Sequence, residues 1–131
     1  MGAGRLSWRS ERGSASAELV IAAPLLLLLI LGIVQFALWE HATHVAEAVA
    51  AQGLAAGRIE GGTSKAATAE AESVLSQLGS GVLSHPKVSA TRGAITTTVV
   101  VTGKAEAVLP FLSLPVRSEA TGPTERFTSG P

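Results

Sequence analysis

The sequence predicts an α+β protein in which one long N-terminal transmembrane helix extends into a small extracytoplasmic domain. That domain is expected to contain a second helix and a three- or four-stranded antiparallel sheet. Three patterns predict this. Residues 19–39 form an apolar run, apolar residues recur at helical spacing in residues 64–78, and polar and apolar residues alternate after residue 87. We divide the chain into a basic leader, a transmembrane helix, a juxtamembrane helix extension and an α+β domain, at residues 1–13, 14–39, 40–60 and 61–131.

The apolar run of residues 19–39 is long enough to cross a bilayer. As a helix, its 21 residues would rise about 31 Å, close to the ~30 Å thickness of a hydrocarbon core. Gln35 is the only strongly polar residue in the run. Pro24 and Gly32 are helix breakers that membrane helices tolerate better than soluble ones. The run therefore predicts a single membrane-spanning helix.

Positive charge is concentrated before the apolar run. Arg5, Arg9 and Arg12 precede it, whereas the next basic residue is Arg58. This asymmetry predicts a cell-membrane protein with a cytoplasmic N-terminus and an extracytoplasmic C-terminal domain. Residues 1–12 show no sustained periodicity, so we expect a disordered leader.

The membrane helix is predicted to continue outward to about Ile59. Residues 40–58 are rich in alanine, the strongest helix former, and contain no proline. Gly53 and Gly57 each cost a helix up to about 1 kcal/mol relative to alanine. We therefore expect a bend near these two glycines.

A second helix is predicted between two glycine-rich breaks. Thr63 or Ser64 can cap its start, and the segment after Leu78 can end it. Its apolar residues form one narrow stripe that faces a partner. The stripe consists of Ala67, Ala71, Val74, Leu75 and Leu78.

The last third of the chain is predicted to form the sheet. Residues 87–92 alternate in polarity, Arg92-Gly93 signals a turn, and residues 94–102 are rich in β-branched side chains. The second strand is expected to continue to Leu109, with a bulge or kink at Gly103. The remaining segments are predicted as a loop, a third strand, a short fourth strand and a frayed tail, at residues 110–115, 116–121, 124–127 and 128–131.

Composition limits the class of protein. The formal net charge is zero and no basic stripe is interleaved with aromatic residues, so nucleic acid is not an expected partner. There is no cysteine, so the domain folds without disulfides. Its apolar residues are mostly alanine and valine, which bury little surface. We therefore expect a domain that gains stability by packing against partners.

No residue pattern indicates catalysis or a cofactor. Glu40, His44 and Glu47 would share one helix face and could in principle hold a metal ion, but this spacing is common, and a solvated juxtamembrane face is the preferred interpretation. His85 precedes Pro86 in a predicted loop. No nucleophile motif or phosphate-binding loop is present. We therefore expect neither an enzyme, nor a metal site, nor a bound cofactor.

Glu18 stands at the start of the apolar run, and two interpretations are open. The carboxylate can remain in the headgroup layer and interact with the helix N-terminus. Alternatively it enters the lipid, where a charge costs about 2.5–3.5 kcal/mol at the helix centre and less near the interface.

The residues around Glu18 resemble a known processing signal. Gly13 and Glu18 are five residues apart, directly before the apolar run, as in the type IV prepilin signal that a prepilin peptidase cuts after glycine. Residues 12–18, with the run that follows, resemble the TadE-like family, pseudopilins of the tight-adherence pilus system. Further similarity, to actinobacterial members, lies in residues 98–103 and 114–127.

This resemblance implies a function as a membrane-anchored minor pseudopilin or pilus assembly protein. Cleavage would fall between Gly13 and Ser14 and leave Ser14 as the mature terminus. Glu18 would pair with the terminal amine of a neighbouring subunit. The implied partners are the membrane, a prepilin peptidase, other pilin or pseudopilin subunits and the pilus assembly machinery. One departure is Leu19, where this system often has tyrosine after the glutamate.

Two alternatives unrelated to pili remain. Ala48-Val49-Ala50 offers a signal peptidase site that would release residues 51–131 as a secreted binding domain. However, the apolar run exceeds the ~7–15 residues of a typical signal core. A plain signal-anchored envelope protein would share the predicted topology.

Overall fold

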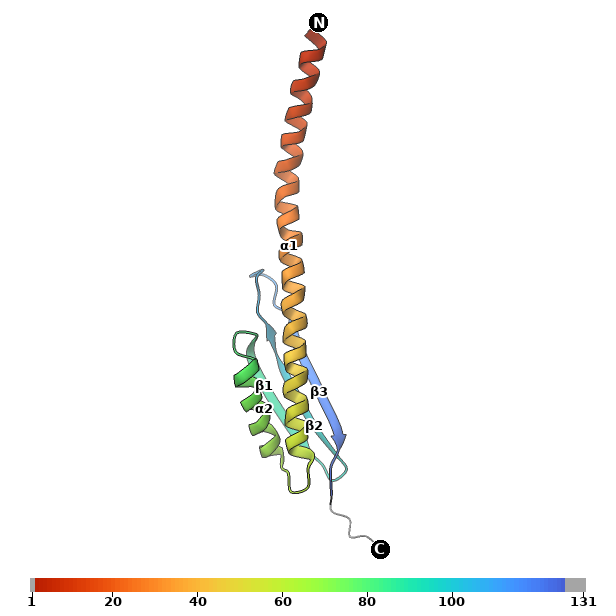
Figure 1. The fold of residues 1–131 in the computed structure, drawn as a ribbon, viewed down its shortest axis with the longest axis vertical. Coiled ribbons are helices and arrows are strands. Elements are labelled where there is room, and N and C mark those ends of the chain that lie inside the picture. Colours follow the sequence, from red (N-terminus) through yellow and green to blue (C-terminus); the bar gives the residue numbers. More distant parts are fainter. Residues whose placement is uncertain (1, 127–131) are drawn as a thin grey trace. The chain divides into compact units, whose positions relative to one another are not determined.

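The computed structural model describes the backbone of residues 2–126 and the side chains of residues 13–126. Its elements follow the order α1 (Gly2–Arg58), α2 (Ser64–Leu78), β1 (Leu83–Arg92), β2 (Thr96–Ala105) and β3 (Pro115–Pro123), shown in Figure 1. A long N-terminal apolar helix, a second helix and a three-stranded antiparallel sheet confirm the α+β prediction.

The chain divides into two compact units, Met1–Val34 and Gln35–Pro131. Helix α1 contributes to both. It is continuous from Gly2, so the prediction of a disordered leader was wrong for the residues that the structure describes. Extending an existing helix requires no new nucleus, so even a leader of glycine, serine and arginine can continue it.

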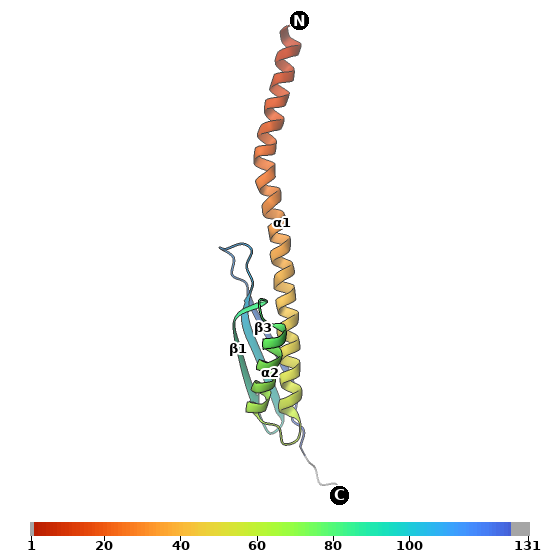
Figure 2. The same cartoon turned by 60° about the vertical axis from the view of Figure 1, so that its left-hand side comes forward.

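In the second unit, α1 and α2 cover one face of the sheet (Figures 1 and 2). Strand β2 lies between β1 and β3, and both pairings are antiparallel. Small side chains dominate the core and let the helices lie close to the strands. The buried core residues are Ala42, Val45, Ala46, Val49, Ala50, Ala67, Ala71, Leu83, Val99, Val101, Ala105 and Val116.

Gly53 and Gly57 permit the close approach of α2 to α1. A Cβ atom added to Gly57 would lie 2.6 Å from the Cβ of Ala67, and one added to Gly53 would lie 3.0 Å from the Cβ of Ala71. We expected any bend of the helix near these glycines, and α1 is helical through both to Arg58. Their structural role is the tight helix contact.

Helix α2 has the boundaries that its capping residues predict. The hydroxyl of Thr63 accepts a hydrogen bond from the backbone N–H of Ala66 at 2.9 Å, which caps the first turn. Ala67 and Ala71 are buried in the core, whereas Leu78 at the end of the same stripe is half exposed.

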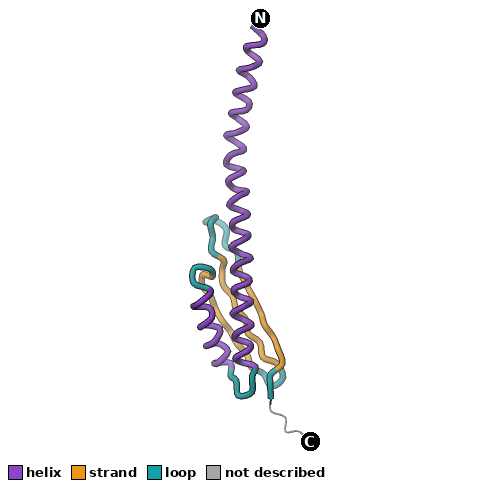
Figure 3. Tube along the Cα trace, viewed as in Figure 1, coloured by secondary structure: helices purple, strands orange, loops and turns teal. Residues whose placement is uncertain are grey.

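The first strand of the sheet (Figure 3) begins earlier in the sequence than the alternation of polar and apolar residues predicts. Strand β1 begins at Leu83 and includes His85 and Pro86, which we expected in a loop. The register shifts between Ser84 and Lys87, so His85 and Pro86 together oppose Gly103 in a β-bulge. His85 has a φ of 51°, as a bulge residue can. Gly103 thus marks the irregularity as predicted, but the extra residue belongs to the partner strand.

The C-terminal strand boundaries also differ from the prediction. Strand β2 ends at Ala105 instead of continuing to Leu109, and β3 spans Pro115–Pro123. Residues 124–126 form no fourth strand. Phe127 and the predicted frayed tail lie outside the described residues.

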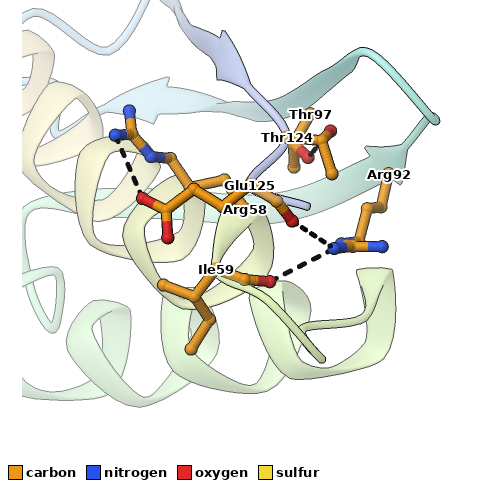
Figure 4. A network of polar contacts seen from close by, with 6 residues as sticks. All are labelled: Arg58, Ile59, Arg92, Thr97, Thr124 and Glu125. Carbon is orange, nitrogen blue, oxygen red and sulfur yellow. Dashed lines mark hydrogen bonds and ion pairs between the residues drawn. The ribbon is translucent and has the colours of Figure 1, made fainter. Parts of the chain in front are cut away.

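Groups from β1 and from the segment after β3 cap the C-terminal end of α1 (Figure 4). Arg92 donates from Nε to the carbonyl of Gly57 at 2.9 Å and from a terminal nitrogen to the carbonyl of Ile59 at 3.2 Å. The backbone N–H of Glu125 donates to the carbonyl of Arg58 at 2.7 Å. The last carbonyls of the helix, which lack partners within α1, are therefore satisfied by residues distant in sequence.

A buried pair of threonine hydroxyls lies next to this cap, at the β1–β2 turn. The Oγ atoms of Thr97 and Thr124 are 2.7 Å apart, and Thr124 donates to the carbonyl of Gly93 at 2.8 Å. Since Thr124 has one hydroxyl proton, Thr97 is the donor within the pair. This contact closes the β1–β2 turn against the segment that follows β3.

Arg92→Ala is expected to lower the free energy of unfolding by about 1–2 kcal/mol, because it removes the cap from α1. The control is Arg117→Ala, which removes only an exposed pair with Glu119 and should change stability by less than about 0.5 kcal/mol. Urea unfolding of the full chain in detergent micelles, followed by circular dichroism, measures both. Equal effects of the two variants would contradict the capping role.

Candidate functional site

The predicted processing and assembly residues lie on one stretch of α1. Gly13, Ser14 and Glu18 are helical and exposed, and no heavy atom lies within 4 Å of a Cβ built on Gly13. Ser14 and Glu18 are four residues apart, so they share one face of the helix. The side chains of Ser14 and Glu18 therefore project from the same side of α1.

The apolar segment after Glu18 presents its large side chains to the surroundings. Val20 is 72% exposed and Leu27 is 56% exposed. Helix α1 is the one helix among the described residues that is long and apolar enough to cross a membrane. A helix that is apolar all round requires lipid or other helices as its environment. The segment therefore fits a membrane anchor.

Gln35 marks the point where α1 enters the second unit. Its side chain is 1% exposed. Its Nε2 donates to the carbonyl of Glu106 at 3.0 Å, and its Oε1 accepts from the backbone N–H groups of Val108 at 2.9 Å and Leu109 at 3.4 Å. The only strongly polar residue of the apolar run is thus a structural residue that joins the helix to the β2–β3 loop, residues 106–114.

This role of Gln35 was missed from the sequence, where the residue counted only as a polar interruption of a membrane span. A single polar residue in an otherwise apolar run was the available signal. Its partners could not be identified because they lie 71–74 residues further along the chain.

The position of Gln35 bears on Glu18. The apolar segment before Gln35, residues 19–34, rises only about 24 Å as a helix, less than the ~30 Å of a hydrocarbon core. If Gln35 stays outside the lipid with its loop partners, a complete span must include residues 15–18. In that case the carboxylate of Glu18 lies at the edge of the hydrocarbon region, at the end of the span opposite Gln35.

The candidate metal ligands do not form a site. Glu40, His44 and Glu47 lie on α1, and His44 and Glu47 are exposed. Within residues 13–126, no three His, Cys, Asp or Glu side chains are grouped closely enough to hold a metal ion. His85 occupies the β-bulge of β1.

The alternative signal peptidase site lies within the core. Val49 and Ala50 have no exposed surface. Cleavage after Ala50 would remove five of the twelve buried core residues, Ala42, Val45, Ala46, Val49 and Ala50. A released segment of residues 51–131 would therefore lack most of the α1 segment that covers its sheet together with α2, which disfavours the secreted-domain alternative.

Comparison with known protein families gives one match. The family model of TadE-like proteins matches residues 13–54, about a third of the chain. The match begins at Gly13 and includes the exposed apolar segment and most of the helix that covers the sheet. No curated protein and no solved structure matches the chain significantly.

Proposed function

We propose that this chain is a membrane-anchored minor pseudopilin or pilus assembly protein. The match of residues 13–54 to the TadE-like family model supports this proposal, because it relates the chain to the pseudopilin-like proteins of the Tad pilus. In this proposal a prepilin peptidase cuts between Gly13 and Ser14, and the mature subunit assembles through its N-terminal helix. The chain is then the substrate of the peptidase and a structural subunit, and has no catalytic role of its own.

One observation carries the proposal. Gly13 and Glu18, which are five residues apart, lie directly before an apolar helical segment whose large side chains are exposed. The processing signal is thus on an accessible helix, and the assembly segment is free to contact lipid or neighbouring helices. The excess of arginine before the segment supports a cytoplasmic leader and an extracytoplasmic domain.

Glu18 has a physical role in this assembly. A carboxylate at the edge of the hydrocarbon region and an ammonium on a neighbouring subunit would each be costly alone. Pairing the two reduces both costs, so association of subunits is favoured over isolated subunits. The ammonium is the mature N-terminus of a neighbouring subunit, which is Ser14 when that subunit is a second copy of this chain.

Processing is tested by sequencing the N-terminus of the protein from a host that contains the peptidase. We expect the mature chain to begin at Ser14. Gly13→Val should retain the leader, because the bulky side chain occupies the residue before the scissile bond. Gly4→Val, a matched change within the leader, should still be cut.

A wild-type chain that retains the leader in such a host would contradict processing. A chain that begins at Ala51 would instead support release by signal peptidase. If the protein's level and location stay unchanged when the pilus machinery is deleted, a signal-anchored protein unrelated to pili is favoured.

A further inference from the structure

The β2–β3 loop, residues 106–114, carries no charge after its first residue, Glu106, and projects an aromatic side chain. Phe111 is 77% exposed, the most exposed large hydrophobic side chain of the described residues. Val108 is also exposed, whereas Leu109 is buried and fastens the loop to the domain. From Ala107 to Val116 the chain carries no charged residue, although the flanking Lys104, Glu106 and Arg117 are charged.

The loop is held beside residues 35–39 of α1, where the second unit begins. Gln35 bonds three backbone groups of the loop, and Trp39 donates from its indole nitrogen to the carbonyl of Pro115 at 3.1 Å. Figure 2 shows the loop at the end of the sheet opposite the α1–α2 connection. These contacts fix the loop at the level of residues 35–39 of α1.

Residues 35–39 directly follow, in the sequence, the apolar segment that fits a membrane anchor. If residues 19–34 lie in the hydrocarbon region, then residues 35–39 lie in the interface on the domain side. Phe36 is exposed at this level, and its ring centroid is 6.1 Å from that of Trp39. Aromatic side chains are enriched at membrane interfaces, where an apolar ring can contact acyl chains.

We propose that the β2–β3 loop is a second membrane contact, with Phe111 inserted at the boundary between headgroups and acyl chains of the outer leaflet. The proposed occupant of this apolar surface is lipid, because the loop is attached to the helix where the anchor ends. An uncharged tip flanked by Lys104, Glu106 and Arg117 suits this position, since the charges can stay among headgroups. The inference rests on the membrane anchor of the proposed function.

The loop contact would orient the domain. A single helix leaves a domain free to rotate and tilt about the point where it leaves the membrane. A second contact at Phe111, on a loop clamped by Gln35, restricts both motions. The sheet would then be presented to neighbouring subunits in one orientation.

Single-cysteine labelling tests the proposal, because the natural chain contains no cysteine. Ser113→Cys places an environment-sensitive fluorophore next to Phe111 without removing it, and Ser113 is exposed. The full chain is reconstituted in phosphatidylcholine vesicles with or without brominated acyl chains, which quench nearby fluorophores. We expect a blue shift and loss of emission at residue 113 in brominated vesicles. Adding Phe111→Ser should restore the emission.

Two further labels serve as controls. Ala94→Cys lies beside Ile95, an exposed apolar side chain of the β1–β2 turn that is 73% exposed, nearly as much as Phe111. It lies at the other end of the sheet and should remain unquenched. Leu27→Cys reports on the anchor itself and should be strongly quenched.

The outcomes separate the loop contact from the anchor. Quenching at residue 27 without quenching at residue 113 would overturn the loop contact and leave the anchor intact. A blue shift at residue 113 without quenching by bromine would mean that protein covers the loop, which also overturns the proposal. No quenching at residue 27 would refute the anchor, and the loop contact with it.

Discussion

Glu18→Ala is expected to leave membrane insertion intact but to weaken association with other pilin subunits. The variant removes a carboxylate from the edge of the hydrocarbon region, so insertion becomes easier. It also leaves the terminal ammonium of a neighbouring subunit without its partner. A cost of roughly 1.4–2.8 kcal/mol, within the range for a charge near lipid, corresponds to about 10- to 100-fold weaker association.

Membrane fractionation and crosslinking between subunits measure the two effects separately. Glu18→Gln should behave like Glu18→Ala, because the amide is similar in size to the acid but carries no charge. The matched control is Glu47→Ala, which removes an exposed glutamate from the part of α1 that covers the sheet. Normal assembly of both Glu18 variants would refute the pairing, and loss of assembly in the control would show a general effect of charge.

Gln35→Leu is expected to lower the free energy of unfolding of the second unit by about 2–4 kcal/mol. Leucine is of similar size but makes no hydrogen bond, so the carbonyl of Glu106 and the N–H groups of Val108 and Leu109 lose their partner. A buried polar group left unsatisfied costs about 1–3 kcal/mol. Because the loop is partly exposed, water can bond some of these groups, so the total cost stays below the sum of three such penalties.

Urea unfolding in detergent micelles measures the stability, and amide hydrogen exchange at Val108 and Leu109 locates the effect. The amides should exchange faster in the variant even where the domain remains folded. Gln52→Leu, at an exposed position of the same helix, is the control and should change stability by less than about 0.5 kcal/mol. Unchanged exchange at Val108 and Leu109 would show that Gln35 does not hold the loop.

Local patterns predicted the helices and the first turn of the sheet well. Helix α2 begins after the Thr63 cap and ends at Leu78, and α1 ends at Arg58, one residue from the expected position. The β1–β2 turn follows Arg92 as predicted. Each of these features depends on residues that are close in sequence, so periodicity and capping residues were sufficient to find them.

The errors occur where distant residues decide the structure. His85 and Pro86 join β1 because they can oppose Gly103 in a bulge, and no local signal reveals that pairing. Strand β2 stops at Ala105, after which the amides of the loop bond to Gln35 instead of to a neighbouring strand. The close contact of Gly53 and Gly57 with α2 was also not predicted, because it involves a different element.

The sequence by itself determined that the chain has a long apolar helix, a second amphipathic helix and strands with a period of two. It also determined the spacing of Gly13 and Glu18 before the apolar segment. These are properties of contiguous residues and follow from side-chain size, polarity and backbone preference. The resemblance of residues 12–18 and the apolar run to the TadE-like family agrees with the family match at residues 13–54, which does not reach the C-terminal segments of that resemblance.

Only the tertiary structure decided where the apolar run joins the folded unit. Gln35 lies inside that run, yet its amide bonds residues 106–109, and this contact assigns it to the folded unit. The physical reason is that a buried amide must find both a donor and acceptors, and the chain supplies them from more than seventy residues away. That contact leaves residues 19–34 as the apolar segment outside the folded unit.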